Sequence, residues 1–435
     1  MIHRSKYKSK FVYFCIILTT FLTSIIYSYD NSHFYRARFF PGEPRFERDY
    51  LTSFDITFAG GSSCKSKSWC GQDTCLLDIC GCYNMQYLGK NVPNKDLSKE
   101  TDLIMHQLEQ VPSRCNFGIL SFSGRFKTWE VDFSFCKNFK KGFFVFLHVP
   151  YRKLEISNVR YKDVSCTVDE TCSLVPCPGT EEANTYWQAF LNMLNPILRD
   201  YKLSISGVSQ KGIGDVSFAI GYTINHEEAD FLDFVDATVK LGVVAPTSKI
   251  KNENYVFSLP LGYNGHTGIF ASFDTALGLY DWATLGLHID AIWFNRRNRK
   301  IRIKTACEQS GLIKLAQDTA KIKHGSIYNG GIYFKADHFV GGFSLLVGYS
   351  YSTKQKDELD CFKDPCTDCN IANSDCALRK WEMHTIHFWT EYDLTKENRA
   401  LCPRLNAFYN LVAGGKRIFK TGIGGGGICL DITWD

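Results

Sequence analysis

The most regular feature of this sequence is an alternation of hydrophobic and polar positions with a period of two. In residues 285–293 the apolar positions are Leu285, Leu287, Ile289, Ala291 and Trp293, with small or polar residues at most positions between them. Because successive side chains of a strand point to opposite faces, this pattern predicts β-strands, about a dozen in all. The clearest other segments are 129–136, 215–222, 343–352 and 428–434, and weaker ones lie at 54–58, 117–126, 143–151, 237–245, 267–280, 331–339, 381–392 and 404–412.

The connections between these segments are of two kinds. Residues 126–129, 280–282 and 340–342 leave room only for hairpin turns. Residues 64–110, 153–212 and 354–380 are long connections. Short turns at one end and long connections at the other predict an antiparallel up-and-down meander.

Two architectures carry such a meander. A soluble sandwich or lipocalin-like barrel buries the apolar face, whereas a membrane barrel turns it to lipid. The membrane form is favoured because the predicted strands are longer than those of a sandwich, which typically have about five or six residues. Their polar faces are also rich in Gly and Ser. Aromatic residues at strand ends, as at a membrane interface, favour it too: Trp129, Tyr222, Tyr280, Trp282, Trp293, Tyr349, Tyr351, Trp389 and Tyr392.

The sequence therefore predicts an all-β protein: an antiparallel up-and-down transmembrane β-barrel of about 12–14 strands, formed by residues 51–435. Before it, four basic residues between Arg4 and Lys10 precede an apolar run from Phe11 to Ile26. The run is short for a membrane span and contains Thr and Ser, so residues 1–28 are predicted to be a secretory signal and residues 29–50 a linker. The alternative is an N-terminal membrane anchor.

Composition narrows the function classes. The mean hydropathy of −0.17 excludes a bundle of transmembrane helices. A net charge of +5 over 435 residues, with no long basic run that has motif support, argues against a nucleic-acid partner. The 33 Phe, 22 Tyr and 8 Trp fit a chain rich in strands. Neither a Gly-x-Ser-x-Gly elbow nor a His-Glu-x-x-His motif is present, so we expect that the protein is not an enzyme and uses no cofactor.

The signal sequence, the meander and the terminal strand 428–434 resemble bacterial outer-membrane β-barrel proteins of the porin-like or FadL-like transporter type. Such proteins commonly end in a strand with a terminal aromatic residue that the barrel assembly machinery reads. Trp434 matches this pattern, although Asp435 follows it. The cysteine clusters resemble, in style, the cysteine-rich major outer-membrane proteins of intracellular bacteria.

The resemblance implies a place in the bacterial outer membrane, contact with outer-membrane lipid and with the barrel assembly machinery, and passive passage of small solutes or hydrophobic molecules. The alternative function is that of a structural or adhesive cell-envelope protein. In that case the barrel anchors surface loops that are cross-linked by disulfides, either to other envelope proteins or to further copies of the chain.

One segment has a helical pattern instead. Thr180 can cap a helix over residues 180–201, in which Trp187, Phe190, Leu194 and Leu198 recur at helical spacing. Pro196 is expected to kink or shorten it. We expect this helical insertion to pack across a barrel mouth; a plug or a helix on the membrane surface are the alternatives. Residues 102–110 can form another short helix.

The 18 cysteines concentrate in three loops, at residues 64–82, 166–177 and 361–376. Cysteines that staple long loops are typical of an oxidising compartment, so disulfides within each loop are predicted. The alternative, a metal site, rests on a lone Cys-x-x-Cys at Cys366 and Cys369, without the second pair that a zinc ribbon needs. The candidates are Cys64, Cys70, Cys75, Cys80, Cys82, Cys166, Cys172, Cys177, Cys361, Cys366, Cys369 and Cys376. Eighteen cysteines less Cys15 of the signal leave seventeen, an odd number, so at least one is free or pairs between molecules.

Two further patterns have simple interpretations. The basic residues between Arg296 and Lys304 could bind lipid phosphates or anionic solutes, but a solvated loop is the simpler expectation. The glycines between Gly422 and Gly427 lack the Gly-Lys-Ser/Thr of a phosphate-binding loop and lead into a strand.

If the apolar faces meet lipid, the opposite faces line the lumen. These faces carry the acids Glu130, Asp132, Asp215, Asp274, Asp290, Asp337 and Asp431 and the bases Arg125, Lys240 and Lys335. Seven acids against three bases predict a negative interior that prefers cations or neutral solutes. The alternative is that the acids pair with these bases and tie the strands together.

Overall fold

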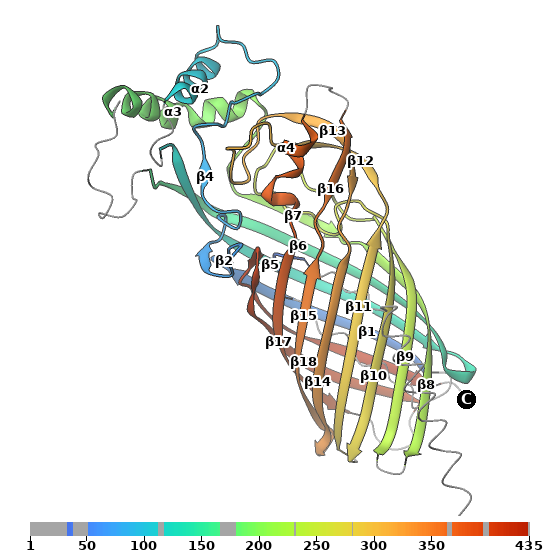
Figure 1. Ribbon diagram of the computed structural model, residues 1–435. Coiled ribbons are helices and arrows are strands. Elements are labelled where there is room, and N and C mark those ends of the chain that lie inside the picture. Colours follow the sequence, from blue (N-terminus) through green and yellow to red (C-terminus); the bar gives the residue numbers. More distant parts are fainter. Residues whose placement is uncertain are drawn as a thin grey trace, which may run out of the picture.

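The strands lie side by side in the order in which they follow one another along the chain. The computed structural model describes residues 33–37, 51–111, 117–165, 180–229, 232–280, 282–362, 368–394 and 400–433. Within these residues, twelve long antiparallel strands form a closed barrel, in which β1 pairs with both β5 and β20 (Figure 1). These strands are β1 (Leu51–Ser63), β5 (Ile119–Asn138), β6 (Phe143–Asp163), β8 (Val216–Ala229), β9 (Leu232–Ala245), β10 (Gly268–Tyr280), β11 (Ala283–Phe294), β14 (Ile327–Val340), β15 (Phe343–Lys354), β17 (Trp381–Asp393), β18 (Leu401–Lys416) and β20 (Gly422–Thr433).

The two kinds of connection separate to opposite ends of the barrel, as the sequence predicts. The turns at 280–282 and 340–342 are confirmed, because β10 and β14 end there and β11 and β15 begin. The turn predicted at 126–129 is wrong. Strand β5 runs without interruption through these residues, with a register shift between Ser123 and Arg125, and its pairing with β1 and β6 satisfies the backbone there.

The long connections build a cap over one end of the barrel, next to the upper ends of β5 and β6 (Figure 1). We use "cap" for the described parts of residues 64–118, 164–215, 246–267, 295–326, 355–380 and 417–421. The cap contains two small three-stranded sheets, and β4 and β7 extend the barrel sheet into it. Its elements are β2 (Lys65–Lys67), β3 (Asp73–Cys75), β4 (Tyr83–Asn84), α2 (Glu100–Gln110), α3 (Thr180–Asp200), β7 (Val208–Ile213), β12 (Arg297–Arg302), β13 (Gln317–Lys323), β16 (Glu358–Phe362), α4 (Cys369–Asn373), a 3₁₀ turn (Cys376–Leu378) and β19 (Ile418–Phe419).

Helix α3 confirms the predicted helical insertion and continues through Pro196 to Asp200. Its apolar face is buried, including Trp187, Phe190 and Leu194, and it packs against α2. The Trp187 Nε1 donates a hydrogen bond to Asp163 at the upper end of β6, 2.6 Å away. The helix is therefore part of the hydrophobic core of the cap. In the described part of the chain, none of the helices has the length and apolar character needed to cross a membrane.

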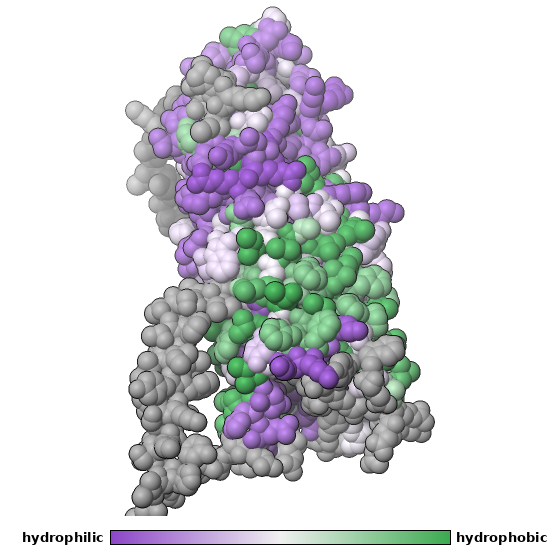
Figure 2. Space-filling view, turned by 90° about the vertical axis from the view of Figure 1, so that its right-hand side faces the viewer, coloured by the Kyte–Doolittle hydropathy of each residue, from purple (hydrophilic) through white to green (hydrophobic). Residues whose placement is uncertain are grey.

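The outer wall of the barrel is apolar. Each of the twelve strands exposes large hydrophobic side chains, for example Phe58 of β1, Ile220 of β8 and Ile269 of β10, which are 49%, 57% and 56% exposed. On the face shown in Figure 2, hydrophobic residues form a band below a hydrophilic cap. Trp129, Trp282 and other aromatic residues predicted at strand ends are exposed on this wall. An outward apolar face on a closed antiparallel barrel is the form of a membrane-spanning β-barrel.

Candidate functional site in the lumen and the cap

The inward faces of the strands carry almost all of the predicted lumen charges. Glu130, Asp132, Asp215, Lys240, Asp290, Lys335 and Asp431 are buried inside the barrel, and Asp274 and Asp337 are partly buried there. Arg125 is the exception and corrects the prediction. It is exposed and shares the outward face of β5 with Trp129, because it is four residues from Trp129 in a strand of period two.

Most of these charges have partners of opposite sign. Lys240 Nζ lies 3.0 Å from Asp274, and Lys335 Nζ lies 2.7 Å from Asp337. Asp132 lies 3.4 Å from Nε2 of His148 on the neighbouring strand. Asp290 accepts a hydrogen bond from Asn329 on β14. The alternative in which lumen charges tie strands together therefore describes the pair Lys240–Asp274, which joins β9 and β10. Lys335 and Asp337 both lie on β14.

Three further arginines, which were not predicted to line the lumen, complete the network of buried ion pairs. Arg404 of β18 lies between Glu391 of β17 and Asp431 of β20, at 2.7 Å from each. Arg152 and Arg36 both contact Glu130 Oε2, at 2.8 and 3.3 Å. The sequence pattern could have placed Arg152 in the lumen, because it lies just beyond the alternating segment 143–151. It is four residues from His148 and therefore shares the same face of the strand.

The connection between β9 and β10 folds into the mouth of the barrel. Its Ser248 and Tyr263 backbone N–H groups donate to the carboxylate of Asp215, at 3.0 and 2.5 Å. Its Leu261 carbonyl accepts from Nη1 of Arg152 at 3.0 Å. Two buried charges thus fix this loop inside the mouth, and the sequence shows only its polar, glycine-containing composition.

Residues 33–37 fill the remaining space at the mouth. Tyr35, Arg36 and Ala37 are completely buried, although they belong to the stretch predicted as a linker. The Tyr35 hydroxyl donates to the Pro260 carbonyl at 2.6 Å, and the Thr421 hydroxyl donates to the Tyr35 carbonyl at 2.9 Å. This segment lies between the β9–β10 connection, which we call the inward loop, and residues 419–421 before β20, and its arginine is paired with Glu130.

A cavity of about 230 Å³ lies between this segment and the cap. Its wall is largely apolar and comes from segments far apart in the sequence: residues 33–35, the loop around Leu77 and Ile79, the inward loop around Phe257 and Leu259, and Phe419. We call it the cap cavity. Its apolar wall and small volume suit a small hydrophobic molecule.

One side of the cap cavity carries buried titratable groups. Burial, the larger effect, lowers the pKa of His324 to about 3, although Asp357 opposes this shift. Burial acts to raise the pKa of Asp357, but the nearby Lys354 and His324 outweigh it and hold this pKa below its usual value. The Lys354 Nζ is 2.6 Å from Asp357. At neutral pH this wall therefore contains a neutral imidazole beside a closed ion pair.

The cysteines correct the predicted pairing. Cys80 and Cys376 form a disulfide, with Cα atoms 5.7 Å apart, so the first and third cysteine loops are joined to each other. Spacing in the sequence could not show this, because the barrel brings together loops 296 residues apart. Cys64, Cys70, Cys75, Cys82 and Cys369 are free thiols. Cys166, Cys172, Cys177 and Cys366, like Trp434 and the predicted signal, lie outside the described residues, and so does the side chain of Cys361.

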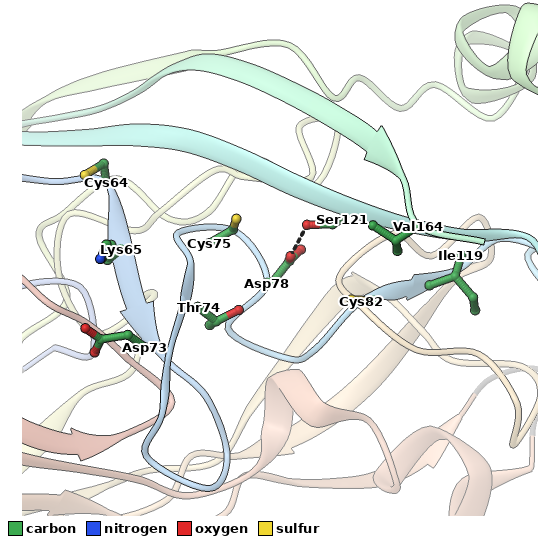
Figure 3. A pocket seen from close by; sticks show the side chains of 10 residues that line it. All are labelled: Cys64, Lys65, Asp73, Thr74, Cys75, Asp78, Cys82, Ile119, Ser121 and Val164. Atoms are coloured by element: carbon green, nitrogen blue, oxygen red, sulfur yellow. Dashed lines mark hydrogen bonds between the residues drawn. The ribbon is translucent and has the colours of Figure 1, made fainter. Parts of the chain in front are cut away.

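Three of the free thiols surround a second, more open pocket of about 830 Å³ (Figure 3). Cys64, Cys75 and Cys82 line it together with Asp78, which accepts a hydrogen bond of 2.5 Å from Ser121. Across the described ranges no group of three or more His, Cys, Asp or Glu residues is arranged to hold a metal ion.

The basic run has a structural role. Arg302 donates to the carbonyls of Tyr201, Glu253 and Leu315, at 2.6–3.1 Å. Arg299 donates to the Asn264 carbonyl at 3.1 Å. The run forms β12 and joins the inward loop to the rest of the cap, so it is more ordered than the solvated loop that was expected.

The solved structures that are similar to this chain share little of its sequence. No family model matches the chain, and no curated protein matches it. Among solved structures, an outer membrane channel from Pseudomonas putida F1 is 10% identical with a TM-score of 0.47, covering 91% of this chain and all of the other. A FadL homologue from Pseudomonas aeruginosa is 8% identical, with a TM-score of 0.30 and coverage of 89% and 90%. The translocator domain of the autotransporter NalP from Neisseria meningitidis is 7% identical, with a TM-score of 0.31 and coverage of 89% and 90%.

Proposed function

We propose that the protein is a channel of the bacterial outer membrane that admits small hydrophobic molecules, which bind first in the cap cavity. The apolar cavity above the barrel mouth is the observation that carries this proposal. A hydrophobic molecule that leaves water gains free energy in proportion to the apolar surface that it buries, and the cap cavity offers such a surface next to the mouth.

Side chains and backbone segments occupy the barrel mouth below the cavity. The Arg36–Glu130–Arg152 cluster, the inward loop and residues 33–37 occupy the mouth. Passage therefore requires that residues 33–37 move, and the ion pair between Arg36 and Glu130 opposes this movement. In this proposal the segment is a plug that opens only part of the time.

Binding to the cap cavity can be tested by calorimetry with toluene as the probe and the full chain in detergent. The wild type is expected to bind toluene, and Leu259→Trp, which fills the cavity, is expected to abolish binding. Leu97→Trp is the matched control, because Leu97 is a cap residue that is 49% exposed and does not line the cavity. Equal binding by the wild type and Leu259→Trp would rule out the cap cavity as the binding site.

Conductance in planar bilayers tests the plug. The wild type is expected to be closed most of the time, and Arg36→Gln to open more often, because one ion pair that holds residues 33–37 is lost. Arg296→Gln, which removes an exposed ion pair with Asp360 in the cap, serves as the control. If Arg36→Gln conducts no more than this control, residues 33–37 do not gate the lumen.

The alternative function, a structural envelope protein with cross-linked loops, is favoured by one observation. Cys64, Cys70, Cys75, Cys82 and Cys307 are exposed free thiols on the cap. Disulfide-linked multimers on non-reducing gels, together with neither toluene binding nor conductance, would favour this function over a channel.

A further inference from the structure

The outer wall of the barrel carries a groove that the channel function does not use. It lies where β5, β1, β20 and β18 run side by side, and its volume is about 710 Å³. Arg125, Lys127 and Lys153 stand on one side of it, and Trp129 and Tyr409 flank it.

Three glycines form the floor of the groove. Gly60 of β1 and Gly422 and Gly424 of β20 line it, and the ring of Tyr409 lies against Gly422 and Gly424. Neighbouring outward positions on the same strands, such as Phe58 and Ile428, carry large apolar side chains. Gly60 therefore leaves a recess beside the ring of Tyr409 in an otherwise apolar wall, open on the side that faces lipid.

The groove lies at the upper edge of the apolar band. Trp129 is nine residues above Asn138, where β5 ends at the turn side of the barrel. At about 3.3 Å per residue and a tilt of about 40°, nine residues rise about 23 Å, close to the height of the apolar band of a membrane barrel, about 25 Å. Trp129 and Tyr409, which are 47% and 48% exposed, thus lie at the level of an interfacial aromatic girdle, and Lys127 and Arg125 lie just above it.

The basic side chains of the groove lack sufficient counter-charges. Arg125 and Lys127 are exposed and form no ion pair within the described residues, although Glu155 stands opposite Lys127 in the strand register. Lys153 lies 3.2 Å from Glu155, but in the strand register it also faces Lys211 of β7. Like charges in directly opposed positions destabilise a sheet. Four cations thus surround one carboxylate, and an anion bound there would relieve their mutual repulsion.

We propose that this groove binds a phosphorylated lipid of the outer leaflet. Its phosphate lies between Arg125, Lys127 and Lys153, and an acyl chain lies in the glycine recess beside Tyr409. Charge above the aromatic girdle and an apolar recess in the strand row of Trp129 and Tyr409 match the phosphate and the upper part of an acyl chain of an anionic lipid, whereas a free anion would make no contact with the recess.

Native mass spectrometry of the full chain in detergent can test this proposal with three probes: lipid A that bears two phosphates, phosphatidylcholine and inorganic phosphate. We expect the wild type to retain lipid A in preference to phosphatidylcholine, and inorganic phosphate not to displace it. Arg125→Gln with Lys127→Gln should weaken lipid A binding about 25-fold, at about fivefold for each charge removed at a membrane surface.

The matched control is Arg160→Gln with Lys162→Gln. It removes the same charge from exposed positions higher on β6, outside the groove. This variant should bind lipid A almost as the wild type does. Equal losses in the two double variants, or equal retention of phosphatidylcholine, would overturn the proposal in favour of general charge attraction. Displacement of lipid A by inorganic phosphate would show a plain anion site instead.

A second variant tests the recess without changing the charge. The Cβ of Gly60→Leu would have its nearest neighbour, the Thr128 carbonyl oxygen, at 3.6 Å, an ordinary contact, so the barrel should fold. Its side chain would occupy the groove and should weaken lipid A binding, while the band of the unheated protein on gels stays that of the wild type. Wild-type lipid binding by this variant would contradict the assignment of the acyl chain to the recess.

Discussion

At the scale of single residues, the inside of the barrel depends on buried charges that are paired across strands. Arg404 is the clearest case, because its guanidinium contacts Glu391 and Asp431 at 2.7 Å and all three side chains are at most 10% exposed. Taking these groups out of water costs free energy that only their mutual contacts offset. Each such residue therefore matters more for stability than a surface charge does.

Arg404→Gln is predicted to lower the free energy of unfolding by about 3–5 kcal/mol, because it leaves two carboxylates buried without their cation. The measurement is the temperature at which the compact form of the unheated protein disappears from gels. Lys323→Gln is the control: it removes an ion pair with Glu358 in which both side chains are 49% exposed, and should leave this temperature unchanged. Restored stability in Arg404→Met with Glu391→Gln and Asp431→Asn would support the explanation, and an equal loss in Lys323→Gln would contradict it.

At the scale of elements, the closing strand β20 depends on its glycines. At Gly425 an added Cβ would meet the Phe58 carbonyl oxygen and approach Ala59 Cα to 2.9 Å on β1. The glycine run of the sequence thus permits the close approach of strands where the barrel closes, and is no phosphate-binding loop.

Gly425→Ala is therefore expected to push β1 and β20 apart and to destabilise the barrel by about 1–3 kcal/mol, the usual range for overpacking. Gly60→Ala, whose Cβ has its nearest neighbour at 3.6 Å, makes the same change on β1 without the clash. Thermal unfolding followed by circular dichroism compares the two. Equal midpoints would show that the seam accepts a side chain at Gly425.

At the scale of the whole molecule, the disulfide between Cys80 and Cys376 joins the connection after β1 to the connection after β15. It fixes two distant parts of the cap to each other beside the cap cavity, which both cysteines line. The barrel closes through its strand pairing, whereas the cap depends in part on this bond.

Cys80→Ser with Cys376→Ser is predicted to let trypsin cut the cap at least tenfold faster while the barrel stays intact. A disulfide typically contributes about 2–4 kcal/mol, and cleavage follows the population of the opened form. Cys307→Ser, which removes an exposed free thiol, should be cut like the wild type. Unchanged cleavage in the double variant, or loss of the barrel together with the cap, would contradict this separation.

The period-two pattern by itself determined the barrel. Alternation in segments such as 285–293 and 343–352 specifies strands with one apolar face, because side-chain direction in a strand follows from local geometry alone. Short turns at 280–282 and 340–342 specify the order of neighbouring strands. Helix α3 followed from its own helical spacing. These features need no information from distant parts of the chain.

Tertiary structure alone decided the contents of the barrel and the cap. The burial of Tyr35 and Arg36, the inward loop held by Asp215 and the bond between Cys80 and Cys376 all join segments that are far apart in the sequence. Such contacts depend on how the closed barrel brings its loops together, and no local sequence pattern indicates which distant segments will meet. For the same reason the partners of Glu130 and Asp431 became visible only when the strands stood next to one another.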